Sequence, residues 1–557
     1  MTRQIEAVLF DMGGTLRGAR KRSREERLKF TGEILKLLGS SADPADFSRL
    51  LARRMTAYRH WARETLIELS EPDLWTRWLL PDWPEDLVRK HSVQFNLLWR
   101  DATGERILFP ETAEVIIELF RRGYRLGLVS NTTSSTEAPE ALKKHGLTSY
   151  FETIILSAVV GKRKPDPGIL LEATHRMEIE PGQCAYIGDL PHRDVAAARK
   201  AGFSITVLIR HRSRRGARPV NDPALEPDHR ITDLRELLDL FPVRTPPQPV
   251  KVYQASVSTM WGMKNFASLG DFIEAGRRIG FGKIELNHQV DSFMLESVHL
   301  NGHQFSSVHE PCPADISVAT LKQRDWLISA TDESCRREGV KAMRRSIDLA
   351  QKLGAGAVVV HAGSVDSNRS IEDRLCALFT EGMKDSNEFS ELRQHFVDKR
   401  RVLAPPRFEA VKRSLVELLD YAAGKNVRLG LENRFHFMEI PSPNELGELL
   451  DLAGPDRLGF LFDVGHAQAL SRLGFYPHEE WLERFGPRII GTHLHDVAGI
   501  QDHLVPGQGD VDFKKVAAHL PKNAFRTLEF QGFNTHEQVK AGLKVLQENG
   551  CISQKKN

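Results

Sequence analysis

The C-terminal 300 residues repeat one pattern eight times: a short apolar run ends in polar residues and is followed by a helical segment. A buried strand followed by a helix is a βα unit, and eight such units close into a barrel. We therefore predict a (β/α)8 barrel over residues 251–557. The eight runs are KVYQASVS (251–258), KIELN (283–287), FSSVHE (305–310), AVVVHAG (357–363), RLGLEN (428–433), LGFLFDVGH (458–466), RIIGTHLHD (488–496) and FRTLEF (525–530).

Most of these strands end in His, Asp or Glu, at the end where a barrel places its active site. Burying so many polar groups without partners would be costly, so we expect a bound cation. Imidazole combined with carboxylate suits Zn²⁺, Mn²⁺ or Co²⁺ rather than Ca²⁺. Glu285 and His495 are either substrate-facing or structural. The candidate residues are His309, His361, Glu432, Asp463, His466, His493, His503 and Glu529.

Residues 1–240 alternate apolar runs with helical patterns, which predicts a parallel sheet covered on both faces. Between about 18 and 105 the pattern becomes helical only, and five of the eight tryptophans fall there. We expect a helical cap, in which the tryptophans fill a small core. The predicted strands are AVLF (7–10), RLGLVS (125–130), TIILSAV (153–159), CAYIGD (184–189) and ITVLIR (205–210).

The length of 557 residues favours two or three domains. The proline-rich stretch 241–250 predicts a linker between a domain at 1–240 and the barrel at 251–557. A second irregular stretch, 210–229, is basic and without periodicity, and we expect a solvated loop.

Polar residues at the strand ends also mark a candidate site in the N-terminal domain. Asp11 follows the first strand, where a carboxylate can attack phosphorus if cations offset its charge. Ser130 and Asn131 end the next strand and can hold a phosphoryl oxygen. Lys164 supplies positive charge. Asp189 and Asp194 follow a later strand and supply oxygen ligands for Mg²⁺.

These four segments, in this order, resemble the motifs of the haloacid dehalogenase superfamily across about residues 4–240. The resemblance implies that Asp11 is the nucleophile and a Mg²⁺ ligand, that Ser130 and Lys164 bind phosphate, and that Asp189 and Asp194 complete the metal site. Phosphatases of that superfamily carry a second Asp two residues after the nucleophile, as general acid and base. Here that residue is Gly13, which predicts a slow phosphatase, a preference for a leaving group that needs no protonation, or a binding domain.

The barrel segments VHEPC, LENR, FDVGHA, THLHD and LEF resemble the xylose isomerase-like barrels, which include sugar isomerases, epimerases and type 2 AP endonucleases. The shared four-ligand site would be Glu432, Asp463, His493 and Glu529. By the same resemblance, Glu432 and Glu529 would be the acid–base pair that moves a proton beside a carbonyl.

The endonuclease-like branch uses three zinc ions, and its added ligands would match His309, His361, His466 and His503. The position of a further Asp ligand is Gln501 here. The adjacent Asp502 is expected to point elsewhere, which would leave a third metal weakly held. His309 and His361 still leave room for a second metal beside Glu432.

Three functional hypotheses follow. The first is a bifunctional enzyme, an isomerase or epimerase barrel joined to a phosphatase, both acting on a small phosphorylated sugar or polyol. The second is a multi-zinc barrel that hydrolyses a phosphoester or nucleotide-like substrate. The third is non-enzymatic, with the N-terminal domain as a docking module. Nucleic acid is not expected as a partner, because residues 251–557 hold 38 Lys and Arg against 40 Asp and Glu.

Composition and hydropathy place the chain in the cytoplasm. The five cysteines are scattered, which favours a reducing compartment over a disulfide framework. No apolar run approaches the roughly 18–20 residues that would cross a membrane, so we expect no membrane partner. The sequence leaves the oligomeric state open, a homo-oligomer included.

Overall fold

The computed structural model describes residues 4–211, 222–245, 251–298, 300, 302–532 and 534–555. Contacts divide the chain into one unit of Met1–Pro247 with Thr535–Glu537, and a second of Gln248–Asn534 with Gln538–Asn557. Residues 246–250 of the predicted linker and 212–221 of the predicted loop lie outside the described residues. In the described part of the chain, no helix is both long and apolar enough to cross a membrane.

The first unit is built on a six-stranded parallel sheet in the order β5-β4-β1-β6-β7-β8. Helices α8 (Gly168–Arg176) and α9 (Ala196–Ala201) pack on the face that Ala7 and Leu9 share. The strands are β1 (Ala7–Phe10), β4 (Arg125–Ser130), β5 (Thr153–Leu156), β6 (Cys184–Gly188), β7 (Ile205–Ile209) and β8 (His229–Ile231). The first five match the predicted apolar runs. We did not predict β8, because two of its three residues are exposed.

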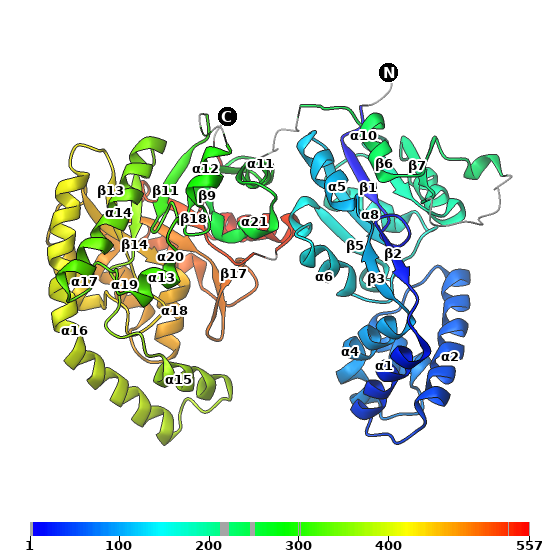
Figure 1. Ribbon diagram of the computed structural model, residues 1–557, viewed down its shortest axis with the longest axis horizontal. Helices are drawn as coiled ribbons and strands as arrows, with labels where there is room; N and C mark the ends of the chain where they lie inside the picture. The colour runs from blue at the N-terminus through cyan, green and yellow to red at the C-terminus, as the bar shows by residue number, and fades with distance from the viewer. Residues whose placement is uncertain are drawn as a thin grey trace. The chain divides into compact units, whose positions relative to one another are not determined.

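A helical cap follows β1 (Figure 1). It has its own core, in which Trp75 and Trp99 are buried and the other three tryptophans of the segment pack against the cluster. The expectation of helix alone is wrong at the ends of this segment, where β2 (Arg17–Arg20) and β3 (Glu105–Leu108) form an antiparallel ladder. The cap elements are α1 (Arg24–Leu37), α2 (Pro44–Thr65), α3 (Glu71–Leu74), η1 (Trp75–Leu79) and α4 (Glu85–Thr103).

The second unit is a closed barrel of eight parallel strands in the order β10-β11-β12-β13-β14-β15-β18-β9 (Figure 1). Every strand of the barrel corresponds to one predicted run, so the predicted fold class is confirmed for both domains. The strands are β9 (Tyr253–Ser258), β10 (Phe281–Leu286), β11 (Phe305–His309), β12 (Ala357–Val360), β13 (Arg428–Glu432), β14 (Leu458–Asp463), β15 (Ile489–Leu494) and β18 (Phe525–Leu528).

The carboxyl ends of these strands carry the predicted polar residues. His309, Glu432 and Asp463 are the last residues of β11, β13 and β14, and Glu529 directly follows β18. Strand β14 is shorter than its apolar run, because Asp463 also caps α18 (Val464–Arg472) by accepting from the backbone N–H of His466 at 2.7 Å. A hairpin of β16 (Asp496–Ala498) and β17 (Gln501–Leu504) follows β15 and brings His503 to the same end.

Candidate active sites

The carboxyl ends of β1 and β6 bring Asp11, Asp189 and Asp194 together, with one oxygen from each within 4.8 Å of the others. Lys164 is fully buried beside them, and its Nζ lies 2.6 Å from Asp11 Oδ1 and 2.9 Å from Asp194 Oδ1. Three converging carboxylates are the oxygen ligands that Mg²⁺ prefers. The residues therefore fit the predicted metal, and the four predicted residues lie in one site.

A fifth residue of this site, Arg193, was not predicted. Its Nη2 lies 3.0 Å from Asp11 Oδ2, 2.9 Å from Asp189 Oδ1 and 2.9 Å from Asp194 Oδ2. Burial alone would lower the pKa of Arg193, but Asp11 and Asp194 outweigh it and raise that pKa well above its usual value. Burial would raise the pKa of Asp194, but Lys164 and Arg193 hold it far below its usual range.

The predicted phosphate-binding residues have different surroundings. Ser130 ends β4, next to β1, and its hydroxyl makes no hydrogen bond to any other residue in the described part of the chain. The Asn131 side chain donates to the Lys164 carbonyl and accepts from the Lys164 backbone N–H, both at 2.9 Å. Asn131 thus positions Lys164, and Ser130 is left available to bind phosphate.

Gly13 stands where the superfamily has its general acid. A Cβ built on Gly13 would meet no atom within 4 Å, and no positive φ is recorded for this residue. The site therefore has space for a side chain at this position. The acid is missing because residue 13 is glycine, not because neighbouring atoms would exclude a larger side chain.

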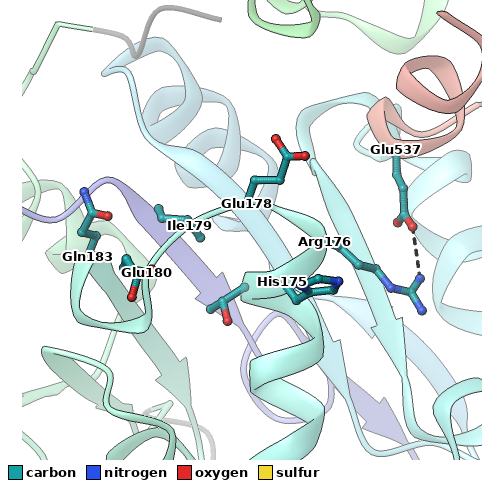
Figure 2. A pocket seen from close by; sticks show the side chains of 8 residues that line it. His175, Arg176, Glu178, Ile179, Glu180, Gln183 and Glu537 are labelled. Carbon is teal, nitrogen blue, oxygen red and sulfur yellow. Dashed lines mark hydrogen bonds and ion pairs between the residues drawn. The ribbon is translucent and has the colours of Figure 1, made fainter. Parts of the chain in front are cut away.

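A surface pocket of the same unit lies at the amino end of β6 (Figure 2). Arg176 at the end of α8, Ile179, Glu180 and Gln183 line it, and Gln183 directly precedes β6. Asp11 follows the end of β1, and β1 and β6 run parallel. The pocket is therefore separate from the carboxylate site.

In the barrel, three buried carboxylates surround one nitrogen of His493. The Nδ1 atom lies 2.9 Å from Glu432 Oε1, 3.5 Å from Asp463 Oδ2 and 2.9 Å from Glu529 Oε2. A single N–H cannot satisfy three carboxylates, so the cluster needs further positive charge. Three of the four predicted ligands, Glu432, His493 and Glu529, form a group with His309 in which one ligand atom of each lies within 4.8 Å of the others, whereas Asp463 groups with Glu432 and His466. These nitrogen and oxygen donors fit a divalent transition metal.

The pKa values of His493 and Glu432 are shifted by the charged side chains around them. Burial would lower the pKa of His493, but Glu529 and Glu285 raise it well above its usual value. Burial would raise the pKa of Glu432, but Arg434 and His361 hold it well below its usual range. Both shifts arise because side chains of opposite charge lie close together at this buried site.

Two residues left open by the sequence hold the ligands in place. Glu285, near the end of β10, lies 3.2 Å from His493 Nε2 and accepts from the Ser307 hydroxyl at 2.6 Å. A carboxylate behind a ligating histidine fixes the orientation of its ring. His495 Nδ1 accepts from the His503 backbone N–H at 2.9 Å, so its Nε2 carries the proton that contacts Asp463 Oδ1 at 3.0 Å. Both residues therefore contact predicted metal ligands, Glu285 at His493 and His495 at Asp463.

The second oxygen of Glu432 faces another group of residues. His361 Nε2 lies 2.8 Å from Glu432 Oε2, and His309 Nε2 lies 3.8 Å from it. Burial lowers the pKa of His361 to about 3, with Arg434 and His309 adding to the shift, so this imidazole is neutral. The Arg434 guanidinium contacts the same oxygen, an ion pair that the sequence did not predict. A positive charge therefore already lies where a second metal would bind.

The remaining candidates form a third group. His503 Nδ1 lies 2.8 Å from Asp502 Oδ2, and His466 Nε2 lies 3.7 Å from the same oxygen. The prediction that Asp502 points elsewhere is therefore wrong. His503 has a φ of 55°, a left-handed backbone conformation in the β17 strand that carries Asp502 and His503.

Comparison with known proteins identifies both domains. Residues 5–202 match the haloacid dehalogenase-like hydrolase family, and residues 303–549 match the xylose isomerase-like TIM barrel family. The phosphoglycolate phosphatase of Nitrosococcus oceani is 31% identical over 209 residues, which are 37% of this chain and 85% of that protein. The chain belongs to the haloacid dehalogenase-like hydrolases and carries a xylose isomerase-like barrel.

Other relatives include the glyceraldehyde 3-phosphate phosphatase of Methanopyrus kandleri, 28% identical over 42% of this chain and 97% of that protein. A solved haloacid dehalogenase-type phosphatase from Thermococcus onnurineus is 26% identical over 43% of this chain and 99% of its own, with a TM-score of 0.28. A solved D-tagatose 3-epimerase-like protein is 21% identical over 53% of this chain and 96% of its own, with a TM-score of 0.38. The Nitrosococcus oceani and Methanopyrus kandleri relatives, which resemble the haloacid dehalogenase-like domain, are both phosphatases by name.

Proposed function

We propose that the chain is a bifunctional enzyme for a small phosphorylated sugar or polyol. The barrel isomerises or epimerises its substrate by proton transfer between carboxylates at one divalent metal, and the haloacid dehalogenase-like domain removes phosphate. The convergence of Glu432, Asp463 and Glu529 on His493 Nδ1 carries the barrel assignment. That the two domains share one substrate is an analogy from their fusion.

In the barrel, Glu432 Oε1 and Glu529 Oε2 approach the same point from different strands. One carboxylate can remove a proton from the carbon beside a carbonyl, and the other can return one to the neighbouring position or the opposite face. A bound divalent metal would polarise the carbonyl and a hydroxyl. The metal would be held by Glu432, Asp463, His493 and Glu529.

In the haloacid dehalogenase-like domain, an Asp11 carboxylate oxygen would form a bond to phosphorus as the bond to the leaving alkoxide breaks. Lys164 and Ser130 would hold the phosphoryl oxygens. The alkoxide must take its proton from water, because Gly13 offers none, and water then hydrolyses the aspartyl phosphate. A Mg²⁺ held by Asp11, Asp189 and Asp194 would offset the negative charge.

Deuterium exchange tests the barrel assignment. The full chain, loaded with Mn²⁺ or Co²⁺, is incubated with a panel of ketoses and ketose phosphates in D₂O, and NMR follows the C–H signals beside the carbonyl. We expect exchange that Glu432→Gln and Glu529→Gln abolish and Asp11→Asn leaves intact. Exchange that survives both glutamate substitutions would refute the assignment.

Phosphate release from the same phosphorylated panel tests the other domain. We expect Asp11→Asn to abolish release and Glu432→Gln to leave it unchanged, because the nucleophile belongs to the first unit alone. Release that persists in Asp11→Asn would rule out the nucleophile.

A multi-zinc barrel that hydrolyses a phosphoester is the second candidate. Two observations favour it: His309 and His361 approach Glu432 Oε2, and Asp502 lies between His466 and His503. The Arg434 guanidinium on Glu432 Oε2 opposes it, because a second metal would have to displace or tolerate that charge. We therefore favour the single-metal barrel.

A further inference from the structure

One nitrogen of Arg193 makes the contacts that a metal ion would make in the haloacid dehalogenase-like domain. Nη2 contacts one oxygen of each of the three carboxylates at 2.9–3.0 Å, and Nε contacts Asp194 Oδ1 at 3.1 Å. A magnesium ion takes oxygen ligands at about 2.0–2.1 Å and can approach them far more closely than a guanidinium can. Because Nη2 touches all three carboxylates, it occupies the position from which one ion would contact the same three oxygens.

Charge balance gives the reason for this arrangement. Three carboxylates meet Lys164 and Arg193, which leaves the cluster with one excess negative charge. Without Arg193 the excess would be two, which is costly at a buried site. Exchanging Arg193 for a divalent cation would make the cluster neutral. The free enzyme and the metal-bound enzyme can therefore each hold the carboxylates together, with different cations.

Only one of the two basic side chains can leave. Lys164 is completely buried, and its Nζ also contacts the Val129 carbonyl at 2.9 Å and the Tyr186 hydroxyl at 2.6 Å. The Arg193 side chain is 19% exposed, and within the described residues its contacts at this site are to the three carboxylates. It lies in a π-helical turn, Pro191–Val195, a local geometry that is frequent at functional sites.

We propose that Arg193 is an internal counter-ion that competes with the divalent cation for Asp11, Asp189 and Asp194. Metal entry then requires the Arg193 side chain to swing toward solvent, and Arg193 sets the metal concentration at which the domain is loaded. The proposal rests on the metal site assigned under the proposed function.

Magnesium titration of the chelator-treated full chain by calorimetry tests the proposal. We compare the native chain, Arg193→Gln, Arg193→Lys and the matched control Arg199→Gln, which removes a partly exposed arginine outside the carboxylate cluster. Heat that persists in Asp189→Asn belongs to other sites and is subtracted. We expect Arg193→Gln to bind Mg²⁺ at least about ten-fold more tightly than the native chain, Arg193→Lys to be intermediate, and Arg199→Gln to match the native chain.

If Arg193→Gln binds Mg²⁺ no more tightly than the native chain, while Asp189→Asn still removes binding, the proposed role of Arg193 is overturned and the metal site stands. Binding that Asp189→Asn does not change would instead overturn the metal assignment. Thermal unfolding provides a second readout for a variant that is unstable in chelator. Mg²⁺ should raise the unfolding midpoint of Arg193→Gln more than that of the native chain, and an equal rise in both would contradict the proposal.

Discussion

At the scale of single residues, Gly13 is the position that should limit the phosphatase activity that we propose. Lys164, Asp189 and Asp194 lie around Asp11, the proposed nucleophile, but the residue two positions after Asp11 carries no carboxyl group. The space beside Gly13 is open, so an acidic side chain could be accommodated there although none is present.

Restoring the acid should therefore raise activity. We predict that Gly13→Asp increases the turnover of a phosphorylated substrate by about 10²-fold or more, because general acid catalysis contributes roughly 10²–10⁴ in rate. Gly13→Asn is the matched control, since it fills the same space but has no acid to donate. Steady-state phosphate release measures the effect. Equal turnover in Gly13→Asp and Gly13→Asn would contradict this account of the site.

In the barrel, a substitution of Glu285 tests how the predicted metal ligand His493 is held. It contacts His493 Nε2 and would fix the ring that presents Nδ1 to the metal. We predict that Glu285→Gln weakens metal binding about 10–100-fold, the usual cost of losing such a partner. The exposed Glu296→Gln is the control. Competition with a metal-binding dye measures the affinity, and unchanged affinity in Glu285→Gln would assign Glu285 to another role.

At the scale of elements, helix α19 (His478–Phe485) begins with a buried histidine. Burial lowers the pKa of His478 to about 4, and the start of a helix also disfavours a positive charge. The unfolded chain binds a proton near pH 6.5, whereas the folded chain does so only near pH 4. The contribution of His478 to stability is therefore complete above about pH 6.5 and is lost as the pH falls toward 4.

We predict that His478→Gln reduces the loss of stability on acidification. The expected difference between the native chain and the variant is at most about 3 kcal/mol, because each pKa unit corresponds to about 1.4 kcal/mol. Denaturant unfolding at pH 6.5 and pH 4.5 measures it, with the exposed His303→Gln as control. The same acid sensitivity in all three proteins would disprove the pKa assignment.

The strands could be predicted from the sequence because each is a short apolar run with a polar end. That pattern gave eight candidate residues in the barrel, and the resemblance to the xylose isomerase-like barrels singled out Glu432, Asp463, His493 and Glu529 among them. Arg193 and Arg434 could not be predicted, because no periodicity distinguishes an arginine that turns onto carboxylates from one that faces solvent. The direction of Asp502 depends on the β16–β17 hairpin, whose register the sequence does not reveal.

At the scale of the whole molecule, the two proposed catalytic clusters lie in different units. We predict that their activities are chemically independent: Asp11→Asn should leave barrel metal binding unchanged, and Glu432→Gln should leave Mg²⁺ binding to the other domain unchanged. Calorimetric titration with each metal in turn measures both. A change of more than about three-fold across units would show a coupling that the separate clusters do not explain.

The central claim is that one divalent metal lies between Glu432, Asp463, His493 and Glu529, with Arg434 in place of a second. Elemental analysis of the purified full chain, prepared without chelator, tests it most directly. The account predicts about one Mn²⁺, Co²⁺ or Zn²⁺ per chain, lost in His493→Ala and retained in His309→Ala. Two or three zinc ions per chain, reduced by His309→Ala or His361→Ala, would contradict it and favour phosphoester hydrolysis.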